Sequence, residues 1–139
     1  MKHLIYISVA VFISLTALSC SSKNDKEEVK KENIVFGINA DNHILERKTI
    51  EAGETWSKIL DSYGIGHSKV LKLDQLTKDI CPLNQIRAGK HYTVFTHQDS
   101  VKTYLDYIVY EKNVEDYVVF AFVGDSIAVS EGKREIQIR

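Results

Sequence analysis

The chain has 139 residues and a formal net charge of −1, with 18 Lys and Arg against 19 Asp and Glu. A chain of this length holds one domain or two very small ones. The near balance of charges argues against proteins that bind nucleic acid through its phosphates, so we expect no nucleic-acid partner.

The start of the chain predicts export. A basic beginning, Met1-Lys2-His3, precedes an apolar segment from Leu4 to Leu18, and small residues stand at its boundary. This order is typical of a secretory signal peptide. The apolar segment is shorter than the roughly twenty residues that a membrane-spanning helix needs. We therefore assign residues 1–19 as a signal peptide.

Cys20 directly follows Ala17-Leu18-Ser19, and this arrangement resembles the lipobox of bacterial lipoproteins. In that family the thiol takes a diacylglyceryl group and becomes the new N-terminus. The resemblance implies that Cys20 is the lipidation site and that the protein is anchored to a bacterial membrane, facing the periplasm or the surface of the cell envelope. The alternative is a plain secretion signal with a chance cysteine.

Residues 20–33 combine the lipidated cysteine with a stretch rich in charges of both signs and almost without apolar side chains. Such a stretch cannot bury enough apolar surface to offset its ordering entropy, so we predict a disordered tether. With Cys20 acylated, Cys81 is the remaining thiol, and we expect no disulfide framework. Its neighbours Ile80 and Pro82 predict a small buried apolar residue.

Residues 44–95 predict a strand, two helices and a strand. In the first helix, Trp56, Ile59, Leu60 and Tyr63 recur on one face. Trp56 is therefore expected to pack in the core, with a role as a sugar platform as the alternative. The expected elements are a strand at 44–50, a helix at 56–63 with Thr55 as N-cap and Gly64 as terminator, a helix at 68–80 ended by Pro82, and a strand at 92–95.

The remaining residues predict an antiparallel β-region. In the strand at 104–110, alternation places Leu105, Tyr107 and Val109 on one face. The nearly continuous apolar run at 117–123 predicts a central strand covered on both sides. We further expect a two-residue hairpin loop at 124–125, a strand at 127–129, a turn at 131–133 and a last strand at 135–138. Because the chain stops at Arg139 within that strand, we expect an open edge and a truncated region.

Two short motifs resemble a known domain type. Gly53-Glu54-Thr55-Trp56 looks like the opening of a LysM-type domain, and Ile86-Arg87-Ala88-Gly89-Lys90 resembles the turn before that family's closing strand. The resemblance implies an α+β fold, in which a LysM-like strand-helix-helix-strand module at 34–98 precedes a small antiparallel β-meander at 99–139. It also implies a glycan-binding surface on two loops, with the candidate residues Gly53, Glu54, Thr55, Ser57, Asn84, Gln85, Arg87 and Lys90. The alternative is that these are ordinary polar residues of the protein surface, which would give the same pattern.

Over residues 44–138 the chain resembles the N-terminal region of secreted murein endopeptidases of the lysostaphin type. The resemblance rests on the order of Gly53-Glu54-Thr55-Trp56, the segment at 83–90, Val109-Tyr110-Glu111 and the apolar strand at 117–123. In those proteins a zinc peptidase domain follows, with zinc bound through His-x-x-x-Asp and a later His-x-His. A catalytic zinc needs three closely placed protein ligands. The residues four positions after His43, His67, His91 and His97 are not Asp, and His-x-His does not occur in this chain. We therefore expect no metal site, no cofactor and no catalytic residue.

The leading hypothesis is a non-catalytic, lipid-anchored module of the cell envelope that binds peptidoglycan or docks on a murein peptidase. One alternative is a shortened endopeptidase precursor, suggested by the abrupt end of the chain. Another is a regulator or inhibitor of such an enzyme, because N-terminal segments of the related enzymes can cover the zinc site.

Overall fold

The computed structural model describes residues 31–135. The predicted signal peptide, the lipidation site Cys20 and the tether up to residue 30 lie outside the described residues. So do residues 136–138 of the predicted last strand. Glu135, the first residue of that predicted strand, is described and is not in a strand.

The described residues form an α+β fold in which short strands come first, followed by two helices and most of a five-stranded sheet. The elements are β1 (Ile34–Val35), β2 (Ile38–Asn39), β3 (Ile44–Thr49), α1 (Trp56–Ser62), α2 (His67–Thr77), a short 3-10 helix (Leu83–Gln85), β4 (His91–Gln98), β5 (Thr103–Glu111), β6 (Asp116–Ala121) and β7 (Ala128–Lys133). The predicted order of strand, helix, helix and strand over 44–95 is confirmed.

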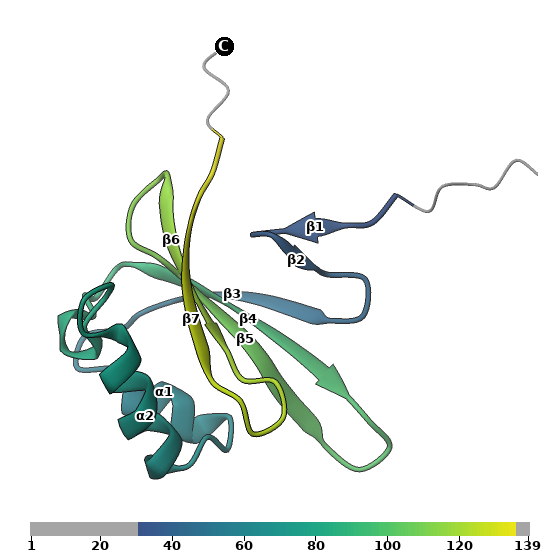
Figure 1. The fold of residues 1–139 in the computed structure, drawn as a ribbon, viewed down its shortest axis with the longest axis horizontal. Coiled ribbons are helices and arrows are strands. Elements are labelled where there is room, and N and C mark those ends of the chain that lie inside the picture. The colour runs from purple at the N-terminus through teal and green to yellow at the C-terminus, as the bar shows by residue number, and fades with distance from the viewer. Residues whose placement is uncertain (1–30, 136–139) are drawn as a thin grey trace, which may run out of the picture. The chain divides into compact units, whose positions relative to one another are not determined.

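The five-stranded sheet is an antiparallel meander, in which each strand pairs with the next one along the chain from β3 to β7 (Figure 1). The boundary that we place between residues 98 and 99 falls at the turn joining β4 to β5, and these two strands are neighbours in the sheet. β3 and β7 form its two edges.

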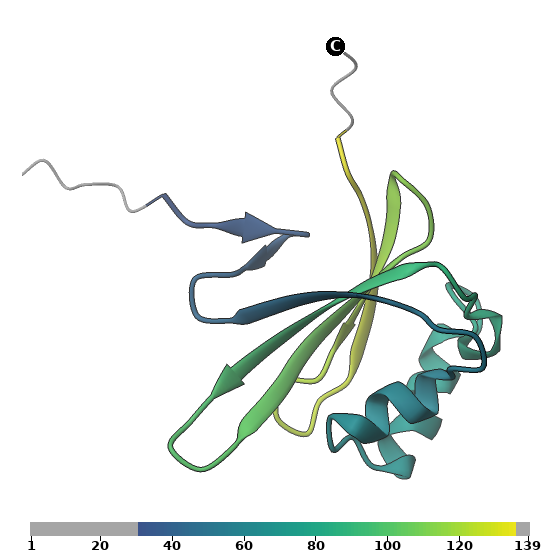
Figure 2. The ribbon, with the colours of Figure 1, turned by 180° about the vertical axis from the view of Figure 1, so that it is seen from behind.

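Helices α1 and α2 lie together over one face of the sheet (Figure 2). Trp56 is 1% exposed at the centre of the helix-side core, the buried cluster between these helices and the sheet. It is therefore a packing residue, and the sugar-platform alternative is wrong. The predicted caps of α1 are confirmed, because the Lys58 N–H donates to Thr55 Oγ1 at 3.3 Å and Gly64 has a φ of +77°.

The opposite face carries the small β1–β2 hairpin, which the sequence analysis did not predict. Phe36 and Gly37 form its two-residue loop, with φ of +52° and +75°. Positive φ at both positions matches the right-handed twist of the flanking strands. The hairpin-side core between it and the sheet contains Ala40, Phe95, Val109 and Val119.

A β-bulge corrects the predicted faces of β5. Phe95 pairs with Tyr107, whereas the next residue of β4, Thr96, pairs with Leu105, so Asp106 has no partner on β4. Because one extra residue shifts the alternation of side chains, Leu105 packs in the helix-side core while Tyr107 packs on the hairpin side. The prediction that Leu105 and Tyr107 share a face is wrong.

Two turn predictions near the C-terminus also need correction. The connection after β6 spans residues 122–127, with turn residues at 124–125, so it is longer than the predicted two-residue loop. Residues 131–133 belong to β7 and do not form a turn. Gly132 lies in that strand opposite Tyr117, whose ring occupies the space where a Cβ would stand.

Candidate functional site

The two predicted glycan-binding loops are held next to each other at the start of β4. The Ile50 N–H donates to the Lys90 carbonyl at 2.8 Å, and the Gly89 N–H donates back to the Ile50 carbonyl at 2.8 Å. Gly89, with a φ of +87°, provides the turn that this reciprocal pair requires. The loop after β3 and the loop before β4 therefore meet at Ile50.

Several of the predicted residues have a structural role within their own loop. Gly53 has a φ of +82°, which favours glycine. One carboxylate oxygen of Glu54 accepts the Glu51 N–H at 2.8 Å, and Thr55 caps α1. On the other loop, Asn84 and Gln85 lie in the 3-10 helix, and the Arg87 carbonyl accepts the Lys90 N–H at 3.3 Å.

Glu54, Ser57 and Lys90 line three different hollows of the surface. Glu54 contributes to the α1 hollow, which lies between β3, α1 and the start of β4 and encloses about 690 Å³. Ser57 contributes to a smaller hollow between α1 and the beginning of α2. Lys90 contributes to a third, described below. The hollows thus divide these three predicted residues among separate places, although the loops themselves touch.

The α1 hollow combines balanced charge with aromatic side chains. Its lining includes Lys48, Glu51, Glu54, Lys58, Tyr63 and Tyr92. The Lys48 ammonium donates to the Tyr63 hydroxyl at 2.8 Å and lies 5.3 Å from the centre of that ring. This hydrogen bond raises the pKa of Lys48. Burial raises the pKa of Tyr92, and the negative charge of Glu54 acts in the same direction. The Tyr92 hydroxyl therefore stays protonated at neutral pH.

A further hollow, which we call the cationic hollow, lies beside β3 on the face of the sheet opposite the helices. It encloses about 450 Å³. We define it by Arg47, Lys90, His91, Glu111, Val114 and Arg134. Arg47 Nε donates to Glu111 Oε2 at 3.0 Å, and Arg134 donates to the other carboxylate oxygen. Sequence reasoning proposed Lys90 as a binding residue but not the arginines or Glu111, because these come from three other segments of the chain.

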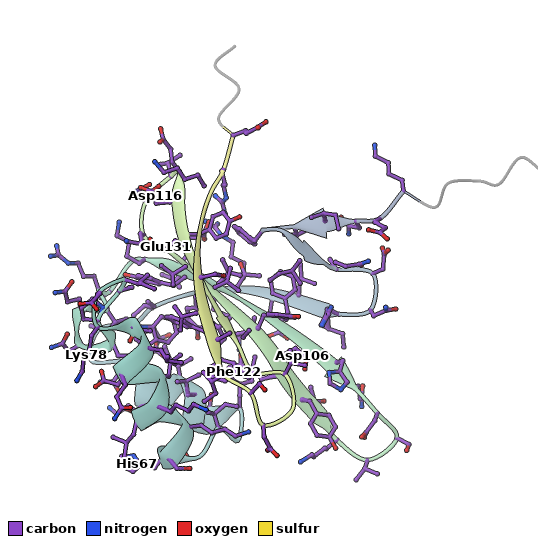
Figure 3. All side chains as sticks on the ribbon, in the orientation of Figure 1. His67, Lys78, Asp106, Asp116, Phe122 and Glu131 are labelled. Carbon is purple, nitrogen blue, oxygen red and sulfur yellow. The ribbon has the colours of Figure 1, made fainter. Side chains whose placement is uncertain are left out.

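Apart from these hollows, a group of polar residues lies around the bulge in β5. His43 Nε2 lies 3.1 Å from Asp106 Oδ2, and His97 Nδ1 lies 2.5 Å from the same oxygen. His43 Nδ1 also faces the Asn39 carbonyl at 2.9 Å. Both partners of His43 are acceptors, so its two nitrogens donate together only when the ring is protonated. Figure 3 shows Asp106 on β5, apart from helix α2, which begins at His67 and is followed by Lys78.

Comparison with known proteins gives a fold relationship. Part of the crystal structure of a zinc containing peptidase from Vibrio cholerae is similar to this chain, with a TM-score of 0.50 and 18% sequence identity. The similarity covers 64% of this chain and 27% of the peptidase chain. No family model matches the chain, and no curated protein sequence matches it.

The zinc of that peptidase raises the question of whether this chain offers ligands for a metal. Within residues 31–135, no group of three or more His, Cys, Asp and Glu side chains is arranged to hold a metal ion. In the group around Asp106, both histidine nitrogens are directed at the same carboxylate oxygen. The two histidines and the carboxylate therefore do not surround a common position where a metal ion could sit. The donors described here do not fit a zinc site.

Two further findings concern the buried cysteine and the length of the helices. Cys81 is free and buried, as predicted, and burial raises the pKa of its thiol. In the described part of the chain, neither helix has the length and apolar character needed to cross a membrane.

Proposed function

We propose that this chain is a non-catalytic, lipid-anchored module of the bacterial cell envelope that binds peptidoglycan through the α1 hollow. The observation that carries the proposal is the composition of that hollow, in which Glu54 from the LysM-like motif lies with two lysines and two tyrosines. Its volume of about 690 Å³ is in the usual range for small-ligand sites.

The chemistry of the hollow suits an amino-sugar polymer. Hydroxyl and acetamide groups of such a glycan need hydrogen-bond donors and acceptors in similar numbers. Lys48 and Lys58 offer donors, and the carboxylates of Glu51 and Glu54 offer acceptors. Glu54 spends one oxygen on the Glu51 N–H, so its other oxygen is the one offered to a ligand. The Tyr63 ring adds an apolar surface for a sugar ring.

Other observations support the remaining parts of the proposal. The lipobox-like segment before Cys20 supports the lipid anchor and the location in the cell envelope. The LysM-like motifs at the start of α1 and before β4 support glycan as the ligand class. The fold is shared with part of a zinc containing peptidase, which favours a second candidate function: docking on a murein peptidase, as a regulator or as part of its assembly.

Retention on purified peptidoglycan sacculi tests the first candidate. The full chain in detergent is incubated with sacculi and sedimented, and the bound fraction is measured. We expect the wild type to sediment, and Glu54→Gln and Lys58→Gln to bind several-fold more weakly. Gln at position 54 keeps an acceptor for the Glu51 N–H, so the loop is preserved. Lys72→Gln, on the exposed side of α2, is the control for Lys58→Gln, because it removes the same charge.

A wild-type chain that stays in the supernatant would contradict glycan binding. Equal retention of Glu54→Gln, Lys58→Gln and the wild type would move any binding away from the α1 hollow. A chain that fails to sediment alone, yet sediments when a murein peptidase is added, would favour the docking candidate.

A further inference from the structure

The cationic hollow faces the side of the sheet opposite the helices. Leu45 and Val109 pack in the hairpin-side core. Arg47 lies two residues after Leu45 on β3, and Glu111 lies two residues after Val109 on β5. Side chains two positions apart in a strand point to the same face. Arg134, which follows β7, lies over the Phe36 ring of the hairpin at 4.6 Å. This hollow is therefore separate from the α1 hollow.

Glu111 is a buried anion that holds the two arginines in place. Its side chain is 7% exposed, whereas those of Arg47 and Arg134 are 58% and 39% exposed. Burial raises the pKa of Glu111, but the hydrogen bonds from the two guanidinium groups outweigh it and lower the pKa overall. The carboxylate is ionised at neutral pH, and each arginine is fixed from beneath while its outer part meets solvent.

The hollow carries more positive charge than Glu111 can balance. Arg47, Lys90 and Arg134 are three cations against one carboxylate, which leaves two positive charges uncompensated among the groups named here. A guanidinium has five N–H donors, and one from each arginine goes to Glu111. The Lys90 ammonium is positioned by a 2.8 Å hydrogen bond to the Lys112 carbonyl. Fixed donors with spare capacity are suited to a planar oxyanion.

An apolar residue lies at the same hollow. Val114 is 73% exposed and lines it together with the cations. A ligand that satisfies both features has a carboxylate next to a small apolar group. An uncharged glycan lacks the first of these features, and inorganic phosphate lacks the second.

We propose that the cationic hollow binds the C-terminal carboxylate of a short peptide that ends in a small apolar residue. Arg47 and Arg134 pair with the carboxylate, Lys90 adds charge, and Val114 contacts the terminal side chain. This inference rests on the proposed function, because the stem peptides of peptidoglycan end in alanine with a free carboxylate. The protein would then contact glycan on one face of the sheet and peptide on the other.

Calorimetric titration of the full chain in detergent tests the inference with a defined probe, an acetylated peptide ending in D-alanyl-D-alanine. The matched probe is the same peptide with a C-terminal amide. We expect the amide to bind about tenfold more weakly, as for the loss of a hydrogen-bonded charge. Arg47→Gln should weaken the acid peptide by a similar factor. Arg47→Lys should recover part of the loss, because it keeps the charge without the planar fork. Lys72→Gln should have no effect.

Equal affinity for the acid and the amide would overturn the inference on the wild-type protein alone, whatever the variants do. Unchanged binding by Arg47→Gln would also overturn it. Inorganic phosphate that binds as tightly as the acid peptide would overturn the peptide assignment, because Val114 would then have no role. Sacculus retention separates this failure from that of the proposed function: it persists if the α1 hollow binds glycan and the cationic hollow binds no peptide.

Discussion

At the scale of single residues, Trp56 shows most directly how a helical pattern becomes a core. Its ring lies edge-on to Tyr92, Tyr110 and Phe120, with centroid separations of 5.8, 5.5 and 5.2 Å. These partners come from three different strands, so one side chain of α1 joins the helix to the middle of the sheet. Its Nε1 has no hydrogen-bond partner among the described residues, so the contacts of this side chain within them are packing contacts.

Trp56→Ala should therefore lower the free energy of unfolding by about 3–5 kcal/mol, as for other large aromatic residues removed from a core. Trp56→Phe should cost much less, because the N–H that it removes makes no hydrogen bond within residues 31–135. Urea denaturation followed by circular dichroism measures both. Val101→Ala, at a position that is 85% exposed, is the control and should change little. A similar loss for Trp56→Phe and Trp56→Ala would contradict this account.

At the scale of secondary-structure elements, an aromatic contact adds to the hairpin-side core in joining the β1–β2 hairpin to the sheet. The Phe36 ring meets Tyr117 edge-on at 5.0 Å, and the Tyr117 ring in turn covers Gly132 of β7. A Cβ on residue 132 would lie 2.3 Å from the Tyr117 ring. The absence of a side chain at Gly132 therefore leaves the space that the Tyr117 ring occupies, and the Phe36 ring of the hairpin packs against Tyr117.

Gly132→Ala should displace the Tyr117 ring and loosen the hairpin while the rest of the sheet persists. We expect faster amide hydrogen exchange in residues 34–39, measured by mass spectrometry, with little change in α1 and β4. Gly66→Ala, where a Cβ meets nothing within 4 Å, should leave the exchange of residues 34–39 unaltered. If Gly132→Ala exchanged there at the wild-type rate, the contact with Tyr117 would not contribute to holding the hairpin.

At the scale of the whole described domain, Glu111 connects segments that lie far apart in the sequence. It sits on β5 and pairs with Arg47 on the β3 edge and with Arg134, which follows the β7 edge. The pKa of Glu111 is below its ordinary value of 4.5 in the folded chain. A carboxylate of this kind stabilises the fold fully above its unfolded pKa, and the stabilisation is lost as the pH falls through the folded pKa.

We therefore expect the melting temperature to be insensitive to Glu111 ionisation between pH 6 and about 5, and to fall below about pH 4.5 as Glu111 is protonated. Glu111→Gln should destabilise the chain at pH 7 and flatten the acid side of this profile. Glu131→Gln is the control, because its side chain is 55% exposed in an ion pair with Lys112. Scanning calorimetry from pH 3 to 7 measures all three proteins. Parallel profiles for Glu111→Gln and the wild type would contradict the prediction.

The sequence by itself determined the features that depend on neighbours along the chain. The apolar spacing of Trp56, Ile59 and Leu60 predicted α1, and Thr55 and Gly64 predicted its ends, because helical periodicity and capping are local. The order of strand, helix, helix and strand followed from the same signals. The two loops that the LysM resemblance brings together do meet at Ile50, which bonds to Gly89 and Lys90, but Glu54, Ser57 and Lys90 line separate hollows.

Only the tertiary structure decided which distant side chains share a site. The bulge at Asp106 shifts the alternation of β5 and brings that carboxylate to His43 and His97, which no local pattern of β5 indicates. Likewise Gly132 reads as a turn residue until the ring of Tyr117 is placed over it. The cationic hollow forms where β3, β4, β5 and the segment after β7 come together around Glu111. The pairing between strands brings these segments together.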